Sequence, residues 1–228
     1  MTRRTDQCLL IDADDTLWEN HRYFLDVFDR FLGLMKLRGH DPLQAATRLR
    51  ATEAERTISH GYGSRNFASS LIQTAAELES RTDPTLKQCF ENEGEWIFHH
   101  PIEVFPDVER TLDALASRHE IHLVTKGDQI EQSGKIERSG LKPYFRTIHI
   151  LREKDVASYR RLLAQLTAGS ERTWMVGNSP RSDINPARLA GLQTVFIPHR
   201  TIWELEDERF DGHPDLSLRR FADLGQHF

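Results

Sequence analysis

Short apolar segments alternate with amphipathic segments along the second half of the chain, and this alternation limits the possible folds more than any other feature. Four segments are expected as strands: IHLVT (121–125), FRTIHIL (145–151), TWMVG (173–177) and QTVFIP (193–198). Four others are expected as helices: Val108–Arg118, Gln129–Ser139, Val156–Leu166 and Ser182–Ala190. Strands that alternate with helices form a parallel sheet with helices on both faces. The sequence therefore predicts an α/β fold.

Residues 20–100 differ from this pattern because they predict helices only. Apolar residues from Phe24 to Met35 recur at intervals of three and four, which places them on one face of a long helix that ends near Gly39. Three further segments are expected as helices: 43–58, about 66–80 and about 84–98. This part of the chain is therefore expected to be an all-helical block.

A strand is expected before the helical block, at residues 7–11, and it must join the later sheet because a lone strand is not stable. The chain is thus expected to begin an α/β domain, leave it for a helical insertion and return. This predicts a core formed by residues 1–18 and 103–228, with residues 19–102 as the insertion. The tail at 215–228 is expected to add an edge strand and a last helix.

Composition excludes several classes of protein. The formal net charge of −5 argues against a general nucleic-acid-binding surface, which would require a basic face. Cys8 and Cys89 are the only cysteines, so the chain can form neither a disulfide framework nor a four-cysteine zinc site. The N-terminal segment does not match a signal peptide, and no stretch approaches the ~20 apolar residues of a membrane span. We expect a cytoplasmic protein that acts without a membrane.

Polar side chains gather where the predicted strands end, at the edge of a parallel sheet where ligands bind. Asp12 and Asp14 follow the first strand, and Asn178 follows the strand at 173–177. Together with the residues after the other strands, they form the predicted site: Asp12, Asp14, Thr125, Lys126, Gly127, Lys154, Asn178 and Asp183. Carboxylates, a hydroxyl, lysines and an amide are therefore expected on one rim.

These groups suit phosphoryl transfer assisted by Mg²⁺, which takes oxygen ligands. Asp12, Asn178 and Asp183 are expected to offer side-chain oxygens to the metal, and Asp14 its backbone carbonyl. Asp12 is the expected nucleophile, forming an aspartyl-phosphate, and Asp14 the expected general acid and base. Thr125, with the backbone amides of residues 126 and 127, is expected to hold phosphate oxygens. Lys154 is expected to neutralise both nucleophile and phosphate.

Four segments in order carry a resemblance to a known family. DADDT (12–16), the strand that ends at Thr125, Lys154, and GNSPRSD (177–183) resemble the four motifs of the haloacid dehalogenase-like (HAD) hydrolase superfamily. One such motif occurs often by chance, but four in order over nearly the whole chain are specific. The resemblance implies a Rossmann-like core, Mg²⁺, an aspartyl intermediate and a helical C1 cap at the insertion.

Two residues refine what the resemblance implies. Dehalogenase members lack the second aspartate of the first motif, so Asp14 indicates a phosphatase. The fourth motif begins Gly-Asp in many relatives, whereas this chain has Asn178 after Gly177, and an amide is a weaker Mg²⁺ ligand than a carboxylate. A related set of HAD-like proteins shows the same Gly-Asn-Ser form, and Asp183 is expected to carry more of the metal binding.

Several residues allow a second interpretation. Lys135 and Lys142 compete with Lys154 for the role of the site lysine, but Lys154 stands at a helix start just after a strand. Asp128 with Glu131 indicates a capping box, hence a structural role. Trp18 is either a lid residue or a core residue. Asp15 is interpreted as a spare carboxylate that points away from the site. Tyr62 and Arg65 belong either to a specificity loop or to a polar connection between helices.

The sequence thus predicts a Mg²⁺-dependent phosphatase for a small phosphorylated metabolite, as a monomer or homodimer. Expected substrate-binding residues are Thr16, Lys126, Gly127, Tyr62 and Arg65. Two alternatives remain: another HAD-type hydrolase (a 2-haloacid dehalogenase or a phosphonatase), or a catalytically silent phosphate-binding regulatory protein. Asp14 argues against dehalogenation, while Asn178 motivates the silent protein.

Overall fold

The computed structural model describes residues 4–81 and 83–228. The chain forms two compact units, one comprising the residues up to His21 together with Ile102–Phe228, the other Arg22–Pro101. Within the described residues, no helix is both long enough and apolar enough to cross a membrane.

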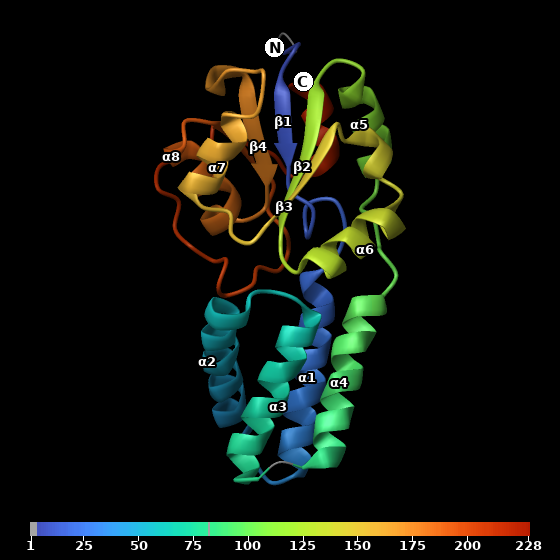
Figure 1. The fold of residues 1–228 in the computed structure, drawn as a ribbon, viewed down its shortest axis with the longest axis vertical. Coiled ribbons are helices and arrows are strands. Elements are labelled where there is room, and N and C mark those ends of the chain that lie inside the picture. The colour runs from blue at the N-terminus through green and yellow to red at the C-terminus, as the bar shows by residue number, and fades with distance from the viewer. Residues whose placement is uncertain (1–3, 82) are drawn as a thin grey trace. The chain divides into compact units, whose positions relative to one another are not determined.

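The first unit contains a six-stranded parallel sheet in the order β3-β2-β1-β4-β5-β6 (Figure 1). Its strands are β1 (Cys8–Ile11), β2 (Glu120–Lys126), β3 (Thr147–Leu151), β4 (Thr173–Gly177), β5 (Gln193–Phe196) and β6 (Leu216–Ser217). This is the α/β, Rossmann-like arrangement that the sequence predicted. The first strand lies in the middle of the sheet although more than one hundred residues separate it from β2, because β1 pairs with both β2 and β4.

Helices cover both faces of this sheet, and Figure 1 shows α5 and α6 on one side and α7 and α8 on the other. They comprise α5 (Val108–Ala116), α6 (Gln129–Ser139), α7 (Val156–Leu163) and α8 (Asn185–Leu189). Alternate residues of β1 enter two different cores: Leu9 and Ile11 pack with α5 and α6, while Cys8 and Leu10 pack with α7 and α8. A strand that is buried on both faces reads as a continuous apolar run.

The second unit consists of four helices, α1 (His21–Leu37), α2 (Pro42–His60), α3 (Ser64–Glu79) and α4 (Pro84–His99). Their apolar faces form one core that includes Val27, Phe31 and Met35 of α1. Aspartates cap two helix starts, since Asp41 accepts from Leu43 N and Asp83 from Thr85 N, and both precede a proline. All four helices occur where the sequence predicted them.

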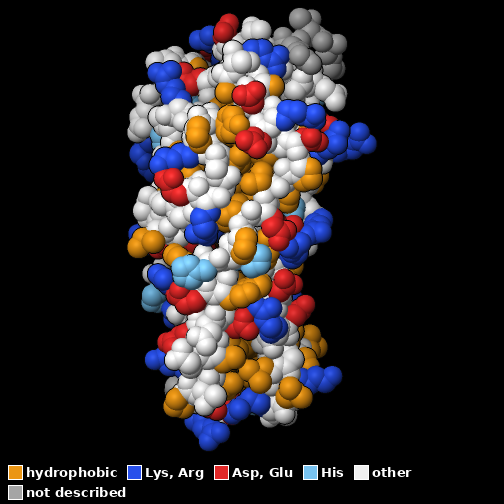
Figure 2. Space-filling view, turned by 90° about the vertical axis from the view of Figure 1, so that its right-hand side faces the viewer, with side chains coloured by type: hydrophobic (Ala, Val, Ile, Leu, Met, Phe, Trp, Pro, Cys, Tyr) orange, Lys and Arg blue, Asp and Glu red, His pale blue; other side chains and the backbone are white. Residues whose placement is uncertain are grey.

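Charged side chains of both signs are interspersed on the face of the molecule shown in Figure 2. Within the helical unit, several pair between segments that are distant in sequence. Arg30 Nη2 lies 2.6 Å from Glu93 Oε2, and Arg38 Nε lies 2.7 Å from Glu79 Oε1. Partly exposed pairs near the surface contribute little to stability, about 0–1 kcal/mol each.

The largest departure from the sequence prediction concerns the helix expected over Ser182–Ala190. The chain forms a π-helical turn over Pro180–Ile184, and α8 is only five residues long. Pro186 contributes to this break because it cannot donate a backbone hydrogen bond. The tail adds the predicted edge strand, but its last helix is a 3-10 helix over Phe221–Gln226.

Candidate active site

Asp12 follows β1 directly and stays in register with β4, because its backbone N donates to Val176 O at 2.9 Å. The carboxylate is only 8% exposed. One of its oxygens, Oδ2, accepts a hydrogen bond from the Thr16 hydroxyl at 2.8 Å. The first motif thus turns back after the strand and supplies a donor to its own first aspartate.

Lys154 connects Asp12 to Asp183. Its ammonium lies 2.5 Å from Asp12 Oδ1 and 2.7 Å from Asp183 Oδ1, and all three side chains are buried. Burial acts against the charge on Lys154, but the two carboxylates outweigh it and raise the pKa of this lysine, which stays an ammonium. Burial and, second, the charge of Asp183 raise the pKa of Asp12 against the lowering effect of Lys154.

Asp183 reaches this position because the π-helical turn and a glycine make room for it. Ser179 N donates to Asp183 Oδ2 at 2.9 Å. A Cβ atom on Gly177 would lie 2.2 Å from Asp183 Oδ2, so any side chain at this position would displace the carboxylate. The glycine of GNSPRSD is therefore required by packing, at the end of β4.

Asp14 is held by a different set of donors from those that hold Asp12. Trp18 Nε1 donates to Oδ1 at 2.7 Å, and Gln132 Nε2 and Lys135 Nζ of α6 donate to Oδ2 at 2.8 and 3.0 Å. The carboxylate is 21% exposed, so it is more open to solvent than Asp12. Trp18 itself is completely buried, which makes it a core residue whose indole N–H orients Asp14.

Lys135 is thus the partner of Asp14, whereas Lys154 is the partner of Asp12. Burial opposes the charge on Lys135, but Asp14 and Glu131 outweigh it and raise the pKa of this lysine. Lys142, the third candidate, is exposed and pairs with Glu137. The structure therefore assigns a separate contact to each lysine.

The residues around Asp12 fit a divalent cation by charge and by donor type. Asp12 and Asp183 share a single ammonium, so one negative charge of this buried group is not balanced. The amide oxygen of Asn178 lies 3.3 Å from the Thr16 hydroxyl, the same hydroxyl that bonds to Asp12. Carboxylate and amide oxygens with surplus negative charge are what Mg²⁺ requires.

Lys126, expected to bind substrate, is held by acidic and hydroxyl groups. Its ammonium lies 2.5 Å from Glu206 Oε1, 2.7 Å from Ser182 Oγ and 3.3 Å from Glu153 Oε1. Glu206 lies far along the chain, in a segment without helix or strand after β5. The sequence offered no signal for this contact.

Thr125 is buried at the end of β2, opposite Ile150 of β3. Gly127 has a φ of 144°, which favours glycine, and its backbone N donates to Leu151 O at 3.2 Å. A phosphate oxygen at the Gly127 amide would therefore compete with an existing hydrogen bond. Asp128 caps α6 by accepting from Ile130 N and Glu131 N, which confirms its structural role.

Tyr62 and Arg65 belong to the helical unit, Arg22–Pro101. Gly61, Tyr62 and Gly63 connect α2 to α3, and Arg65 lies in the first turn of α3. Arg65 Nε donates to Glu95 Oε1 at 2.7 Å, and its guanidinium lies over the ring of Phe98. Their role in substrate binding stays a prediction.

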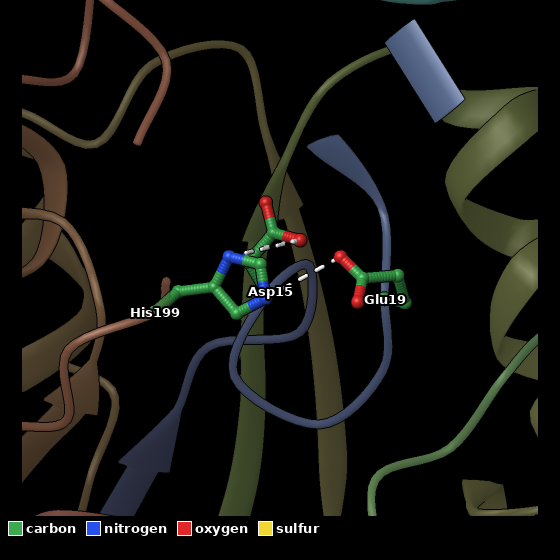
Figure 3. A group of neighbouring side chains, drawn as sticks. All are labelled: Asp15, Glu19 and His199. Carbon is green, nitrogen blue, oxygen red and sulfur yellow. Dashed lines mark ion pairs between the residues drawn. The ribbon is translucent and has the colours of Figure 1, made fainter. Parts of the chain in front are cut away.

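A third group of titratable side chains lies beside the first motif (Figure 3). His199 is flanked by two carboxylates: its Nδ1 lies 3.9 Å from Asp15 Oδ1, and its Nε2 lies 3.3 Å from Glu19 Oε1. Arg200 Nη2 lies 2.8 Å from Glu19 Oε2. Opposite ring nitrogens face the two carboxylates, and one imidazole offers a metal ion one nitrogen, so we interpret this group as an ion-pair network.

Asp15 also positions the start of α1. Its Oδ1 accepts from Asn20 N at 2.9 Å and from His21 N at 3.0 Å, and the residue adopts a positive φ of 61°. The sequence suggested that Asp15 is a spare carboxylate that points away, and these hydrogen bonds show that this interpretation was wrong. Aspartate tolerates this backbone conformation better than most residues, which explains its presence in the turn.

Comparison with known proteins adds to this geometry. A family model described as haloacid dehalogenase-like hydrolase matches residues 7–191. Pyrimidine 5'-nucleotidase PynA of Streptococcus pneumoniae is 32% identical over 121 residues, which are 50% of this chain and 49% of that protein. Glyceraldehyde 3-phosphate phosphatase of Methanocaldococcus jannaschii is 26% identical over 139 residues, which are 56% of this chain and 61% of that protein. The chain therefore spans about half the length of these relatives.

Two solved structures show similarity over almost the whole chain. A haloacid dehalogenase-like family hydrolase from Xanthomonas campestris has 32% sequence identity and a TM-score of 0.79, covering 94% of this chain and 90% of that one. A 2-haloacid dehalogenase from Pseudomonas syringae pv. Tomato has 20% identity and a TM-score of 0.64, covering 97% of both chains, and this likeness shows the fold alone. With the family model matching most of its length, this chain belongs to the haloacid dehalogenase-like hydrolases.

Proposed function

We propose that the protein is a Mg²⁺-dependent phosphatase that hydrolyses a small phosphomonoester through an aspartyl-phosphate on Asp12. The observation that carries the proposal is the different environment of two aspartates only two positions apart. Asp12 is buried against Lys154, whereas Asp14 is more exposed and held by Gln132, Lys135 and Trp18. Two carboxylates with separate environments can perform two different steps.

In the first step, an oxygen of Asp12 attacks phosphorus and the bond from phosphorus to the leaving oxygen breaks. Asp14 gives its proton to that leaving oxygen. In the second step, Asp14 takes a proton from water as the water attacks the phosphoryl group. The bond between phosphorus and Asp12 then breaks, which frees inorganic phosphate and restores Asp12 as a carboxylate and Asp14 in its protonated form.

The other residues hold charges in place during these steps. Lys154 keeps Asp12 oriented and offsets negative charge on the incoming phosphate. We assign the metal to oxygens of Asp12, Asn178 and Asp183 with the backbone carbonyl of Asp14; when bound, Mg²⁺ supplies positive charge that stabilises the transferring phosphoryl group. Thr125, Thr16 and Lys126 are the proposed phosphate-binding groups, whereas the Gly127 amide already donates to Leu151 O.

The two named relatives support a phosphorylated substrate, since one is a nucleotidase and the other a triose phosphate phosphatase. We further propose that residues 19–102 form the cap that selects the leaving group, with Tyr62 and Arg65 as candidate contacts. The substrate panel should therefore contain pyrimidine 5'-nucleotides and short phosphorylated carbohydrates.

The test is phosphate release from an aryl phosphate and from this panel with Mg²⁺, by wild type and Asp12→Asn. We expect turnover that the substitution lowers by at least about 1000-fold, because the amide is a poor nucleophile. Asp41→Asn, a change in the exposed cap of α2, is the matched control and should keep wild-type activity. Equal rates for wild type and Asp12→Asn would refute the nucleophile, and halide release from 2-chloropropionate without phosphate release would favour a dehalogenase.

A further inference from the structure

A segment after β5 contributes one carboxylate to the candidate active site from outside the four motifs. Glu206 is 13% exposed, and both of its oxygens accept hydrogen bonds. Oε1 lies 2.5 Å from the ammonium of Lys126, while Oε2 accepts from Ser179 Oγ at 2.6 Å and from Ser182 Oγ at 2.5 Å. One carboxylate therefore contacts the last residue of β2 and two residues that follow β4.

The segment that carries Glu206 is anchored to the turn of the fourth motif. Arg181 Nη1 donates to Leu205 O at 2.7 Å, and Asn185 Nδ2 donates to Arg209 O at 2.9 Å. Asp211 N in turn donates to Asn185 Oδ1 at 2.8 Å. Backbone and side-chain bonds on both sides of Glu206 thus hold an otherwise irregular segment in place.

The hydrogen bonds of the two serines have a defined direction because each hydroxyl has one proton. Ser179 donates this proton to Glu206 and accepts from Ser182 N at 3.0 Å. Ser182 donates to Glu206 and accepts from Lys126 at 2.7 Å. Both serine hydroxyls need an acceptor at the position of Oε2, and the Lys126 ammonium needs an acceptor at the position of Oε1. A carboxylate offers two acceptor oxygens, whereas an amide offers one, so residue 206 must be an acid to satisfy all three donors.

A chain of contacts continues from this group to the proposed nucleophile. Ser179 N donates to Asp183 Oδ2 at 2.9 Å, and Lys154 lies between Asp183 Oδ1 and Asp12 Oδ1 at 2.7 and 2.5 Å. Burial raises the pKa of Glu206, but Lys126 and the serine hydroxyls outweigh it and lower the pKa, so the carboxylate is ionised at neutral pH.

We propose that Glu206 is a positioning residue for the active site: through Ser179 and Ser182 it fixes the turn that places Asp183, and thereby Lys154 and Asp12. This inference rests on the proposed function, because Asp12 is the nucleophile only if that function is correct. Glu206 itself is assigned no contact with substrate. A small displacement of positioned groups can cost about 100-fold in rate, so the effect is measurable.

The experiment compares Glu206→Gln with Glu208→Gln, the same chemical change at an exposed position two residues on. Kinetics of aryl phosphate hydrolysis are measured well below the unfolding temperature of each variant, and Mg²⁺ binding is measured by calorimetry. For Glu206→Gln we expect kcat to fall at least about tenfold and Mg²⁺ affinity to fall at least about threefold, with KM changed by a smaller factor than kcat because Lys126 loses its carboxylate partner. Glu208→Gln should match wild type.

A double-mutant cycle identifies the route. If Glu206 acts through Ser179, the single variant Ser179→Ala has a lower kcat than wild type. Adding Glu206→Gln to Ser179→Ala then lowers kcat by clearly less than a further tenfold. Unchanged kcat and Mg²⁺ affinity in Glu206→Gln, or equal losses in Glu208→Gln, would overturn the proposal. Should Glu206→Gln not fold, unchanged kcat and Mg²⁺ affinity in Ser179→Ala would overturn it as well.

Failure of the proposed function gives a different result. Wild type would then release no phosphate from any substrate of the panel. The Mg²⁺ affinities of wild type, Glu206→Gln and Ser179→Ala would still decide whether Glu206 positions the residues around Asp183.

Discussion

The ammonium nitrogen of Lys154 lies 2.5 Å from Oδ1 of Asp12, and the two side chains are 1% and 8% exposed. A second carboxylate, Asp183, shares the same ammonium. The lysine therefore offsets charge that would otherwise be buried without a partner. Replacing Lys154 by an uncharged residue should therefore lower stability as well as activity, whereas replacing an exposed lysine should not.

We expect Lys154→Met to lower the free energy of unfolding by about 3 kcal/mol or more at neutral pH, because it leaves two buried carboxylates without their cation. Urea denaturation measures the loss. Lys142→Met, at an exposed ion pair, should change stability by less than about 1 kcal/mol. Millimolar Mg²⁺ should restore part of the stability of Lys154→Met, and equal losses in the two variants would contradict the prediction.

Asp14→Asn should impair hydrolysis most for substrates with a poor leaving group. An alkoxide needs the proton that Asp14 supplies, whereas an aryl oxide leaves without it. We expect kcat/KM to fall about 100-fold or more for an alkyl phosphate and clearly less for an aryl phosphate, as measured by phosphate release. The amide oxygen still accepts from Lys135, so the fold should persist. Equal losses on both substrates would argue against an acid role.

Two glycines in the helical unit should respond to alanine in opposite directions. A Cβ on Gly94 of α4 would lie 2.7 Å from the Cβ of Ala68 in α3, so Gly94→Ala should destabilise by about 1–3 kcal/mol. Gly33 of α1 has no heavy atom within 4 Å of the added Cβ, so Gly33→Ala should stabilise by about 0.5–1 kcal/mol. Denaturant unfolding measures the change in the free energy of unfolding for both variants. A change of the same sign in both would contradict the close contact between α3 and α4.

His21 should make stability depend on pH below neutrality. Burial, and second the charge of His199, lower the pKa of His21 from 6.5 to about 4. Between these values the unfolded chain binds a proton that the folded chain does not, so stability falls as pH drops from about 6.5 to about 4. The loss from this group approaches about 3 kcal/mol at about 1.4 kcal/mol per pKa unit.

The measurement compares the urea stability of wild type and His21→Gln at pH 7.5 and pH 4.5. The substitution should remove the part of the pH dependence that His21 contributes, so the difference between the two proteins should change with pH. His213→Gln, at an exposed position, is the control and should leave the profile unchanged. A difference between wild type and His21→Gln that is constant with pH would contradict the prediction.

Local patterns determined the elements of the fold. A four-residue apolar run predicts β1, and the helices of the second unit follow from apolar spacing and from caps such as Asp41. These features depend on neighbours in sequence, so they can be read without the tertiary structure. The regular alternation of strand and helix also predicted the parallel sheet, because few topologies satisfy it.

The order of motifs indicated which strand ends meet, and the structure places Lys154 in contact with both Asp12 and Asp183 there. The contacts of the other charged residues were not predictable in the same way. Glu206 meets Lys126 across 80 positions, and His199 meets Glu19 across 180. An isolated acid or histidine in a polar segment has no local signal, because its energy depends on burial and on partners that only the folded chain supplies.

The sequence by itself therefore determined the fold class, the family and the carboxylates of the first motif. Lys154 was already expected from the sequence as the partner of Asp12, whereas only the tertiary structure decided the other two pairings, Lys135 with Asp14 and Lys126 with Glu206. Periodicity reflects the burial of apolar faces, which repeats along the chain. Pairing of buried charges is a matter of a few ångströms between distant segments, and that distance exists only after the sheet has brought them together.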